Sequence, residues 1–136
     1  MSEAIEEAYL GLLHAWEHGG ADAVSDKIRE LFTDDTVWVQ PGLATTTGPE
    51  EAIKIVQGWG ATFSTFELDI LHVASTDDAV LVERLDVFRR DDGSTFLSLP
   101  VVGVAEFRDG KITEWREYYD SAAIPGLGPS TKENNG

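Results

Sequence analysis

The chain has 136 residues, enough for one domain with a sizeable hydrophobic core, and its lack of cysteine excludes disulfides, zinc–thiolate sites and a thiol nucleophile. Its formal net charge of -15 argues against nucleic acid and anionic membranes as partners. The sequence shows neither a secretion signal nor an apolar run of membrane-spanning length, so we expect a cytoplasmic protein.

The N-terminal half predicts three helices and one short strand. Apolar residues recur there at helical spacing, Gly19-Gly20 interrupts the first run, and Pro49 lies in the first turn of the last one. The expected helices cover residues 2–18, 21–32 and about 48–59, and the short strand covers residues 36–40.

The C-terminal half predicts a run of strands joined by hairpins. The strands are expected at residues 66–74, 79–90, 95–108 and 111–120. Asp109-Gly110 is a strong hairpin signal, and Arg90-Asp-Asp-Gly-Ser94 fits a hairpin loop with glycine in the left-handed position. Helices followed by hairpins indicate an α+β fold, in which three N-terminal helices close a curved, mostly antiparallel sheet into a cone with a ligand pocket at its mouth. Residues 1–123 would form this single domain, and residues 124–136 a flexible tail.

Charged residues lie on an apolar face of the strand at 79–90. Side chains alternate between the two faces of a strand, so Arg84 and Asp86 share a face with Val80, Val82 and Phe88. Burying such a pair is costly unless the charges satisfy each other, and a cost of this kind often marks a functional site. A purely structural ion network, or a ladder of charges on the surface, is the alternative interpretation.

The hairpins predict which residues lie opposite one another. The loop at Arg90–Ser94 would pair Asp86 with Ser98 and Arg84 with Pro100. The turn at Asp109-Gly110 would pair Val102 with Glu117. The residues expected on one face are Arg84, Asp86, Ser98, Val102, Val104, Trp115, Glu117 and Tyr119. Glu117 would then be two strands from Arg84, a backbone gap of about 9–10 Å that long side chains can close.

Further polar and aromatic residues complete the candidate site. Trp38 and Gln40 share a face of the short strand and would reach the carboxylates if that face points inward. Two carboxyl groups around one arginine suit acid–base chemistry, because one can donate a proton while the other activates water. His14 and His18 have the spacing of a helical metal pair, but no third ligand cluster is evident and we expect no metal.

Several segments together resemble the limonene-1,2-epoxide hydrolase family, within the wider nuclear-transport-factor-2-like and SnoaL-like group. The similar segments are Glu83-Arg-Leu-Asp-Val-Phe88, Val102-Gly-Val104, Asp109-Gly-Lys-Ile-Thr113 and Trp115-Arg-Glu-Tyr-Tyr-Asp120. The resemblance implies that Arg84 and Asp86 are catalytic, with Glu117 at the position of a third, aspartate residue. It also places Trp38 and Gln40 where the family has a tyrosine and an asparagine that hold water.

The resemblance therefore implies an epoxide hydrolase that opens a small apolar epoxide to a diol. Asp86 would protonate the epoxide oxygen, Glu117 would activate water and Arg84 would hold both carboxylates, without a metal, cofactor or covalent intermediate. The expected substrate- or water-binding residues are Gln40, Trp38, Trp115, Tyr119 and Val102. The altered water-holding positions leave an epoxide-opening cyclase of a polyketide-type pathway and a non-catalytic binding module open. The resemblance also implies a homodimer. A steroid-isomerase function is disfavoured, because Gln40 occupies the position of the essential base and cannot accept a proton.

Overall fold

The computed structural model describes residues 2–59 and 65–123, so the predicted tail at 124–136 lies outside the described residues. Its strands form one six-stranded sheet in the order β2-β1-β6-β5-β4-β3. The elements are α1 (Ser2–Leu31), β1 (Phe32–Val39), β2 (Thr45–Thr47), α2 (Pro49–Trp59), β3 (Thr65–Ser75), β4 (Ala79–Arg89), β5 (Thr95–Arg108), β6 (Lys111–Tyr118) and the short 3₁₀ helix η1 (Ser121–Ala123). Among the neighbouring strands only β1 and β6 are parallel, so the predicted α+β fold with a mostly antiparallel sheet is confirmed.

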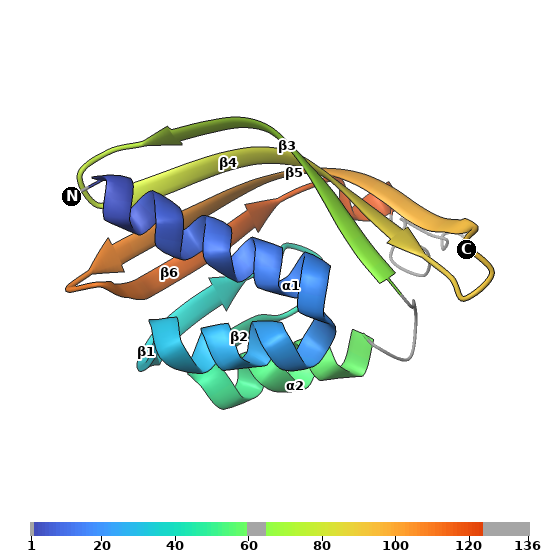
Figure 1. The fold of residues 1–136 in the computed structure, drawn as a ribbon. Helices are drawn as coiled ribbons and strands as arrows, with labels where there is room; N and C mark the ends of the chain where they lie inside the picture. Colours follow the sequence, from blue (N-terminus) through green and yellow to red (C-terminus); the bar gives the residue numbers. More distant parts are fainter. Residues whose placement is uncertain (1, 60–64, 124–136) are drawn as a thin grey trace.

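The sheet curves over the two helices, which cover its concave face (Figure 1). The prediction of three separate N-terminal helices is not confirmed, because the first two are arms of α1 joined at Gly20. Gly20 has φ 73° and ψ -160°, a conformation that glycine adopts without a steric penalty, so the chain bends there with no intervening loop. No helix in the described part of the chain is both long and apolar enough to cross a membrane.

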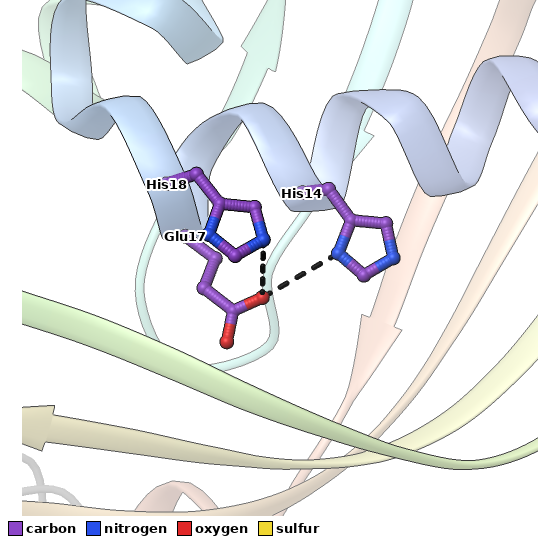
Figure 2. A group of neighbouring side chains, drawn as sticks. All are labelled: His14, Glu17 and His18. Carbon is purple, nitrogen blue, oxygen red and sulfur yellow. Dashed lines mark hydrogen bonds and ion pairs between the residues drawn. The ribbon is translucent and has the colours of Figure 1, made fainter.

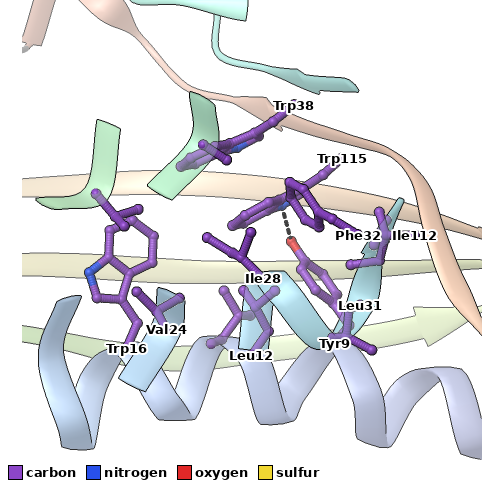
Figure 3. Close-up of a cluster of buried hydrophobic side chains, with 14 of the residues drawn as sticks. Tyr9, Leu12, Trp16, Val24, Ile28, Leu31, Phe32, Trp38, Ile112 and Trp115 are labelled. Carbon is purple, nitrogen blue, oxygen red and sulfur yellow. Dashed lines mark hydrogen bonds between the residues drawn. The ribbon is translucent and has the colours of Figure 1, made fainter. Parts of the chain in front are cut away.

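The core between the helices and the sheet is rich in aromatic side chains (Figure 3). Trp38 of β1 stacks on Trp115 of β6, with ring centroids 4.5 Å apart and planes 5° from parallel. The indole Nε1 of Trp115 donates a hydrogen bond of 2.8 Å to the hydroxyl of Tyr9 on α1. Because buried indole and phenol groups need such partners, this contact fixes α1 on the sheet.

The predicted strand register is wrong by one residue on both sides of β5. Asp86 lies opposite Leu99 rather than Ser98, Arg84 opposite Val101, and Glu117 opposite Gly103. An irregularity between Phe88 and Arg89, and another between Glu106 and Phe107, cause the two shifts.

Both shifts displace β5 by one residue in the same direction, so the alignment of β4 with β6 is as predicted, whereas β5 presents its other face. Arg84 and Glu117 therefore share the inner face, as predicted. Val102 was predicted to face inward, but it pairs with outward-facing Glu83 and is 38% exposed. The β5 residues that do lie on the inner face include Leu97, Leu99, Val101, Gly103 and Ala105.

Candidate active site

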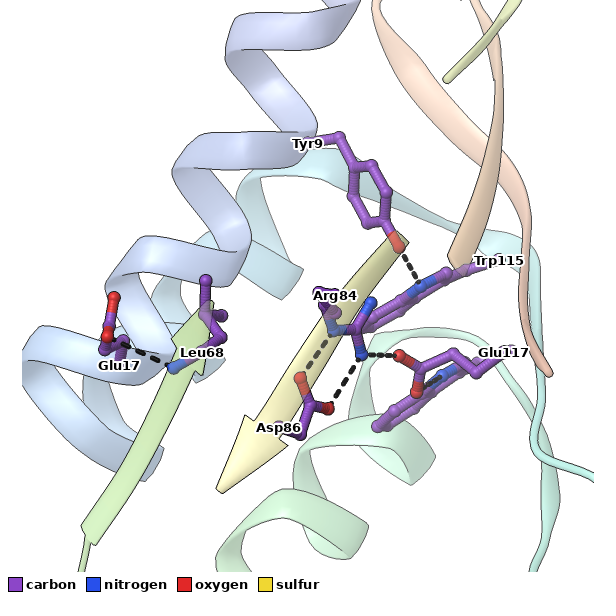
Figure 4. Close-up of polar contacts among 8 residues, drawn as sticks. Tyr9, Glu17, Leu68, Arg84, Asp86, Trp115 and Glu117 are labelled. Carbon is purple, nitrogen blue, oxygen red and sulfur yellow. Dashed lines mark hydrogen bonds and ion pairs between the residues drawn. The ribbon is translucent and has the colours of Figure 1, made fainter. Parts of the chain in front are cut away.

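Arg84 joins two carboxylates in the interior of the protein (Figure 4). Its Nε donates to Asp86 Oδ1 at 2.8 Å and its Nη2 to Asp86 Oδ2 at 3.2 Å. The same Nη2 donates to Oε2 of Glu117. The side chain of Arg84 is 2% exposed and those of both acids are 6% exposed, so all three charges are removed from bulk water.

Strand alternation brings these residues together. Arg84 and Asp86 are two apart on β4, and every second residue of that strand is buried from Val80 to Phe88. Glu117 reaches them from β6, across β5. The β5 residue opposite Glu117 is Gly103, which has no side chain to separate the arginine from the glutamate.

Burial sets the protonation of this network. It raises the pKa of Asp86 from 3.8 to about 6, although the adjacent Arg84 guanidinium opposes the shift. For Arg84, burial disfavours the charge, but Glu117 and Asp86 outweigh it and raise the pKa well above its ordinary value. The arginine therefore stays charged, while Asp86 exchanges its proton close to neutral pH.

Tyr9 is a site residue that the sequence analysis missed. Its hydroxyl accepts the hydrogen bond from Trp115 and lies next to the guanidinium of Arg84. Burial raises the pKa of Tyr9, so the hydroxyl remains neutral. Nothing in the sequence distinguishes Tyr9 from the other apolar-face residues of α1, since only the fold brings it beside Arg84.

The second oxygen of Glu117 also has a partner. The indole Nε1 of Trp38 donates to Glu117 Oε1 at 3.2 Å, as expected for a side chain that can only donate. Directly after the end of β1, the side chain of Gln40 is buried and its Nε2 has no hydrogen-bond partner among the described residues. The Tyr119 hydroxyl is likewise buried without such a partner, and burial raises the pKa of Tyr119.

A cavity of about 180 Å³ opens beside these groups. Its polar wall consists of Gln40, Arg84, Asp86, Glu117 and Tyr119, all of which the sequence analysis selected. Its remaining wall is apolar and consists of Trp16, Leu43, Trp59, Phe88, Phe96, Leu97, Leu99 and Val101. Leu97, Leu99 and Val101 of β5 were missed because of the register error.

Three of the predicted substrate- or water-binding residues lie elsewhere. Trp38 and Trp115 are fully buried behind the cavity wall, where Trp38 contacts Glu117 and Trp115 contacts Tyr9. Val102 lies on the outer face of the sheet. Trp38 and Trp115 therefore contact the polar residues of the site without lining the cavity, and Val102 does not contribute to the cavity.

The chain is similar to known proteins of one family. Residues 5–125 match the family described as the limonene-1,2-epoxide hydrolase catalytic domain. Epoxide hydrolase EphG of Mycobacterium tuberculosis (strain ATCC 25618 / H37Rv) is 30% identical over 95 residues, which cover 70% of this chain and 62% of that protein. The match thus covers less than two thirds of the relative.

Two solved structures are also similar. An LEH-like epoxide hydrolase from M. tuberculosis has a TM-score of 0.67 and 25% identity, covering 88% of this chain and 86% of that one. A putative SnoaL-like polyketide cyclase from Jannaschia sp. CCS1 has a TM-score of 0.77 and 22% identity, covering 95% and 94%, which shows a shared fold. Since the family match extends over most of the sequence, the chain belongs to the limonene-1,2-epoxide hydrolase family.

Proposed function

We propose that this protein is an epoxide hydrolase that opens a small apolar epoxide to a diol by direct attack of water. The observation that carries the proposal is the buried Arg84 guanidinium, which binds Asp86 and Glu117 together at the wall of an apolar cavity. The epoxide hydrolase named among the similar proteins supports the same reaction class.

In the proposed step, protonated Asp86 gives its proton to the epoxide oxygen as the carbon–oxygen bond breaks. Water forms the new bond to the ring carbon and transfers a proton to Glu117. One water is consumed, and the proton on Glu117 returns to Asp86 through solvent after the diol leaves. The two carboxyl groups supply both proton transfers, so the step needs neither a covalent intermediate nor a metal.

The polar wall offers a place for the attacking water. Gln40 Nε2 is a donor at the cavity that has no partner in the part of the chain that the structure describes. Each oxygen of Glu117 keeps a lone pair after accepting from Trp38 and Arg84. A water that accepts from Gln40 and donates to Glu117 has one lone pair left for attack. Arg84 keeps the two acids at a constant separation, which holds the acid and the base in place for reaction.

The cavity limits the size of the substrate. An apolar cavity of about 150 Å³ holds benzene, and the cavity here measures about 180 Å³. We therefore propose a substrate of roughly six to ten non-hydrogen atoms. Its hydrocarbon part would lie against Trp16, Trp59 and Phe88, with the epoxide oxygen directed at Asp86.

Asp86→Asn tests the mechanism, because asparagine keeps the shape of the side chain but cannot supply the acidic proton. Hydrolysis of apolar epoxides of this size, such as cyclohexene oxide and styrene oxide, should fall by about 100-fold to 10,000-fold. Glu83→Gln is the matched control, since Glu83 is exposed on the opposite face of the same strand. Activity of Asp86→Asn within twofold of the parent protein would refute the role of Asp86.

A cyclase is the second candidate. The lone pairs that Glu117 keeps after accepting from Trp38 and Arg84 can accept from a hydroxyl of the substrate itself in place of water. The similarity to the putative SnoaL-like cyclase shows only that the fold is shared. Turnover in ¹⁸O-labelled water distinguishes the two reactions, because hydrolysis incorporates the label and cyclisation does not. Tight binding of epoxides without turnover at any pH would instead support a binding module.

We also propose a homodimer that forms through the outer face of the sheet. Leu81, Val102 and Tyr118 are exposed large apolar side chains on three neighbouring strands of that face. Val102→Glu should convert a dimer to a monomer in light scattering. Val73→Glu is the control, since Val73 is equally exposed but pairs with inward-facing Val82. A mass unchanged by Val102→Glu would place the interface elsewhere.

A further inference from the structure

A second cluster of chemistry-bearing residues lies on α1, outside the cavity wall. His14, Glu17 and His18 project from one side of the helix, with a carboxylate oxygen between the two rings (Figure 2). His14 Nδ1 and His18 Nε2 each lie 3.4 Å from Glu17 Oε1, and all three atoms lie within 4.8 Å of one another. The histidine pair was noted in the sequence without a third ligand, and the structure supplies Glu17.

Two of the three spacings, those between the carboxylate oxygen and each ring nitrogen, match an edge of a metal coordination sphere. Two ligand atoms bound at about 2.1 Å in a tetrahedral zinc site are about 3.4 Å apart. Both nitrogen–oxygen distances here have that value, and they are too long for good hydrogen bonds. The two imidazole rings are nearly parallel, 18° apart, with centroids 5.8 Å apart on the same side of α1 (Figure 2).

Glu17 is held in position from outside the helix. Its second oxygen, Oε2, accepts the backbone N–H of Leu68 on β3 at 3.1 Å (Figure 4). The Glu17 side chain is only 18% exposed, whereas those of His14 and His18 are 45% and 73% exposed. The carboxylate is therefore oriented by the fold, as supporting hydrogen bonds orient metal ligands, while the imidazoles remain accessible to an ion.

The local charge also favours a cation. Within the described residues Glu17 forms ion pairs with these two histidines and with no lysine or arginine. The chain as a whole carries a formal charge of -15. Such a field attracts divalent cations.

We propose that His14, Glu17 and His18 bind one divalent transition-metal ion of the zinc type, with water completing its coordination. Two imidazole nitrogens and one carboxylate oxygen are a donor set that suits zinc. Through the contact between Glu17 and Leu68, the ion would connect α1 to β3. The site is separate from the epoxide-opening residues, so this proposal does not depend on the proposed function.

Titration calorimetry with zinc chloride tests the proposal on the full chain without an affinity tag, after treatment with a chelator. We expect one zinc per chain. His14→Ala and His18→Ala should each weaken binding by at least about tenfold, the loss that even a supporting residue can cause. His72→Ala is the matched control, because His72 is the remaining histidine and pairs with Glu83 on an exposed surface. Equal loss in His72→Ala, or no saturable binding of one equivalent, would overturn the proposal.

Glu17→Gln and a spectroscopic probe separate a metal site from surface histidines that bind zinc nonspecifically. Cobalt(II) chloride should give the visible absorption of a low-symmetry site, and Glu17→Gln should weaken it while His72→Ala leaves it unchanged. Zinc should also raise the melting temperature of the parent protein but not that of His14→Ala. Cobalt spectra that keep the form of the hydrated ion would show that only weak histidine contacts exist.

Discussion

Gly103 and Arg84 lie so close together on neighbouring strands that no side chain fits between them. A Cβ at position 103 would lie 2.7 Å from Arg84 Nη1 and 2.1 Å from the Tyr9 hydroxyl oxygen. The absent side chain of Gly103 therefore makes room for the arginine that joins the two carboxylates.

Gly103→Ala should displace the guanidinium and impair catalysis more than folding. We expect a loss of activity on the order of 100-fold, because small displacements of reacting groups are costly. Overpacking should lower the free energy of unfolding by about 1–3 kcal/mol. Gly58→Ala is the control, since a Cβ there meets nothing within 4 Å. Steady-state rates and urea unfolding measure both effects, and full activity in Gly103→Ala would show that the position of Arg84 does not limit the reaction.

The rate should depend on pH through Asp86. The acid must be protonated to donate to the epoxide, and burial raises its pKa to about 6. We therefore expect kcat/KM to fall about tenfold per pH unit above that pH. The free energy of unfolding should also decrease as the pH rises. A carboxyl group whose pKa is raised on folding stabilises the folded state at low pH, and this contribution is lost as the pH rises through about 6. A rate that increases between pH 6 and 8 would contradict the role of Asp86 as the acid.

Arg84→Met should destabilise the fold strongly at alkaline pH. Removing the cation leaves two buried carboxylates without their partner, a change that costs about 3–5 kcal/mol. The loss should shrink as the pH is lowered, because protonation neutralises the acids. Urea unfolding at pH 8 and pH 5.5 measures the difference. A deficit that is independent of pH would mean that lost packing, rather than uncompensated charge, is responsible.

Glu117→Asp should reduce activity even though aspartate is the residue that the family resemblance associates with this position. Glu117 accepts hydrogen bonds from both Trp38 and Arg84, and a side chain shorter by one methylene cannot reach both donors in place. Losing a hydrogen bond to a charged group costs about 1.5–3 kcal/mol, or roughly tenfold to a hundredfold in rate. Glu114→Asp, on the other face of β6, is the control. Unchanged kinetics in Glu117→Asp would show that the length of this side chain is unimportant.

The faces of the charged residues could be predicted because strand alternation is a local property. Arg84 and Asp86 lie two apart on β4, and the apolar residues around them predicted a buried face. The predicted pairing of β5 was wrong because each hairpin contains an irregularity that the turn sequences do not reveal. Val102 consequently lies outside, and Val101 and Leu99 line the cavity in its place.

The sequence by itself determined the fold class, the family and the inward direction of Arg84, Asp86 and Glu117, because residue periodicity and local motifs carry that information. The tertiary structure alone decided that Tyr9 lies beside Arg84, that Trp38 donates to Glu117 and that Glu17 joins two histidines while bonded to Leu68. Each of these contacts depends on how α1 packs on the sheet or on side-chain conformation at close range. Such long-range packing follows from the whole core and not from any short segment of the chain.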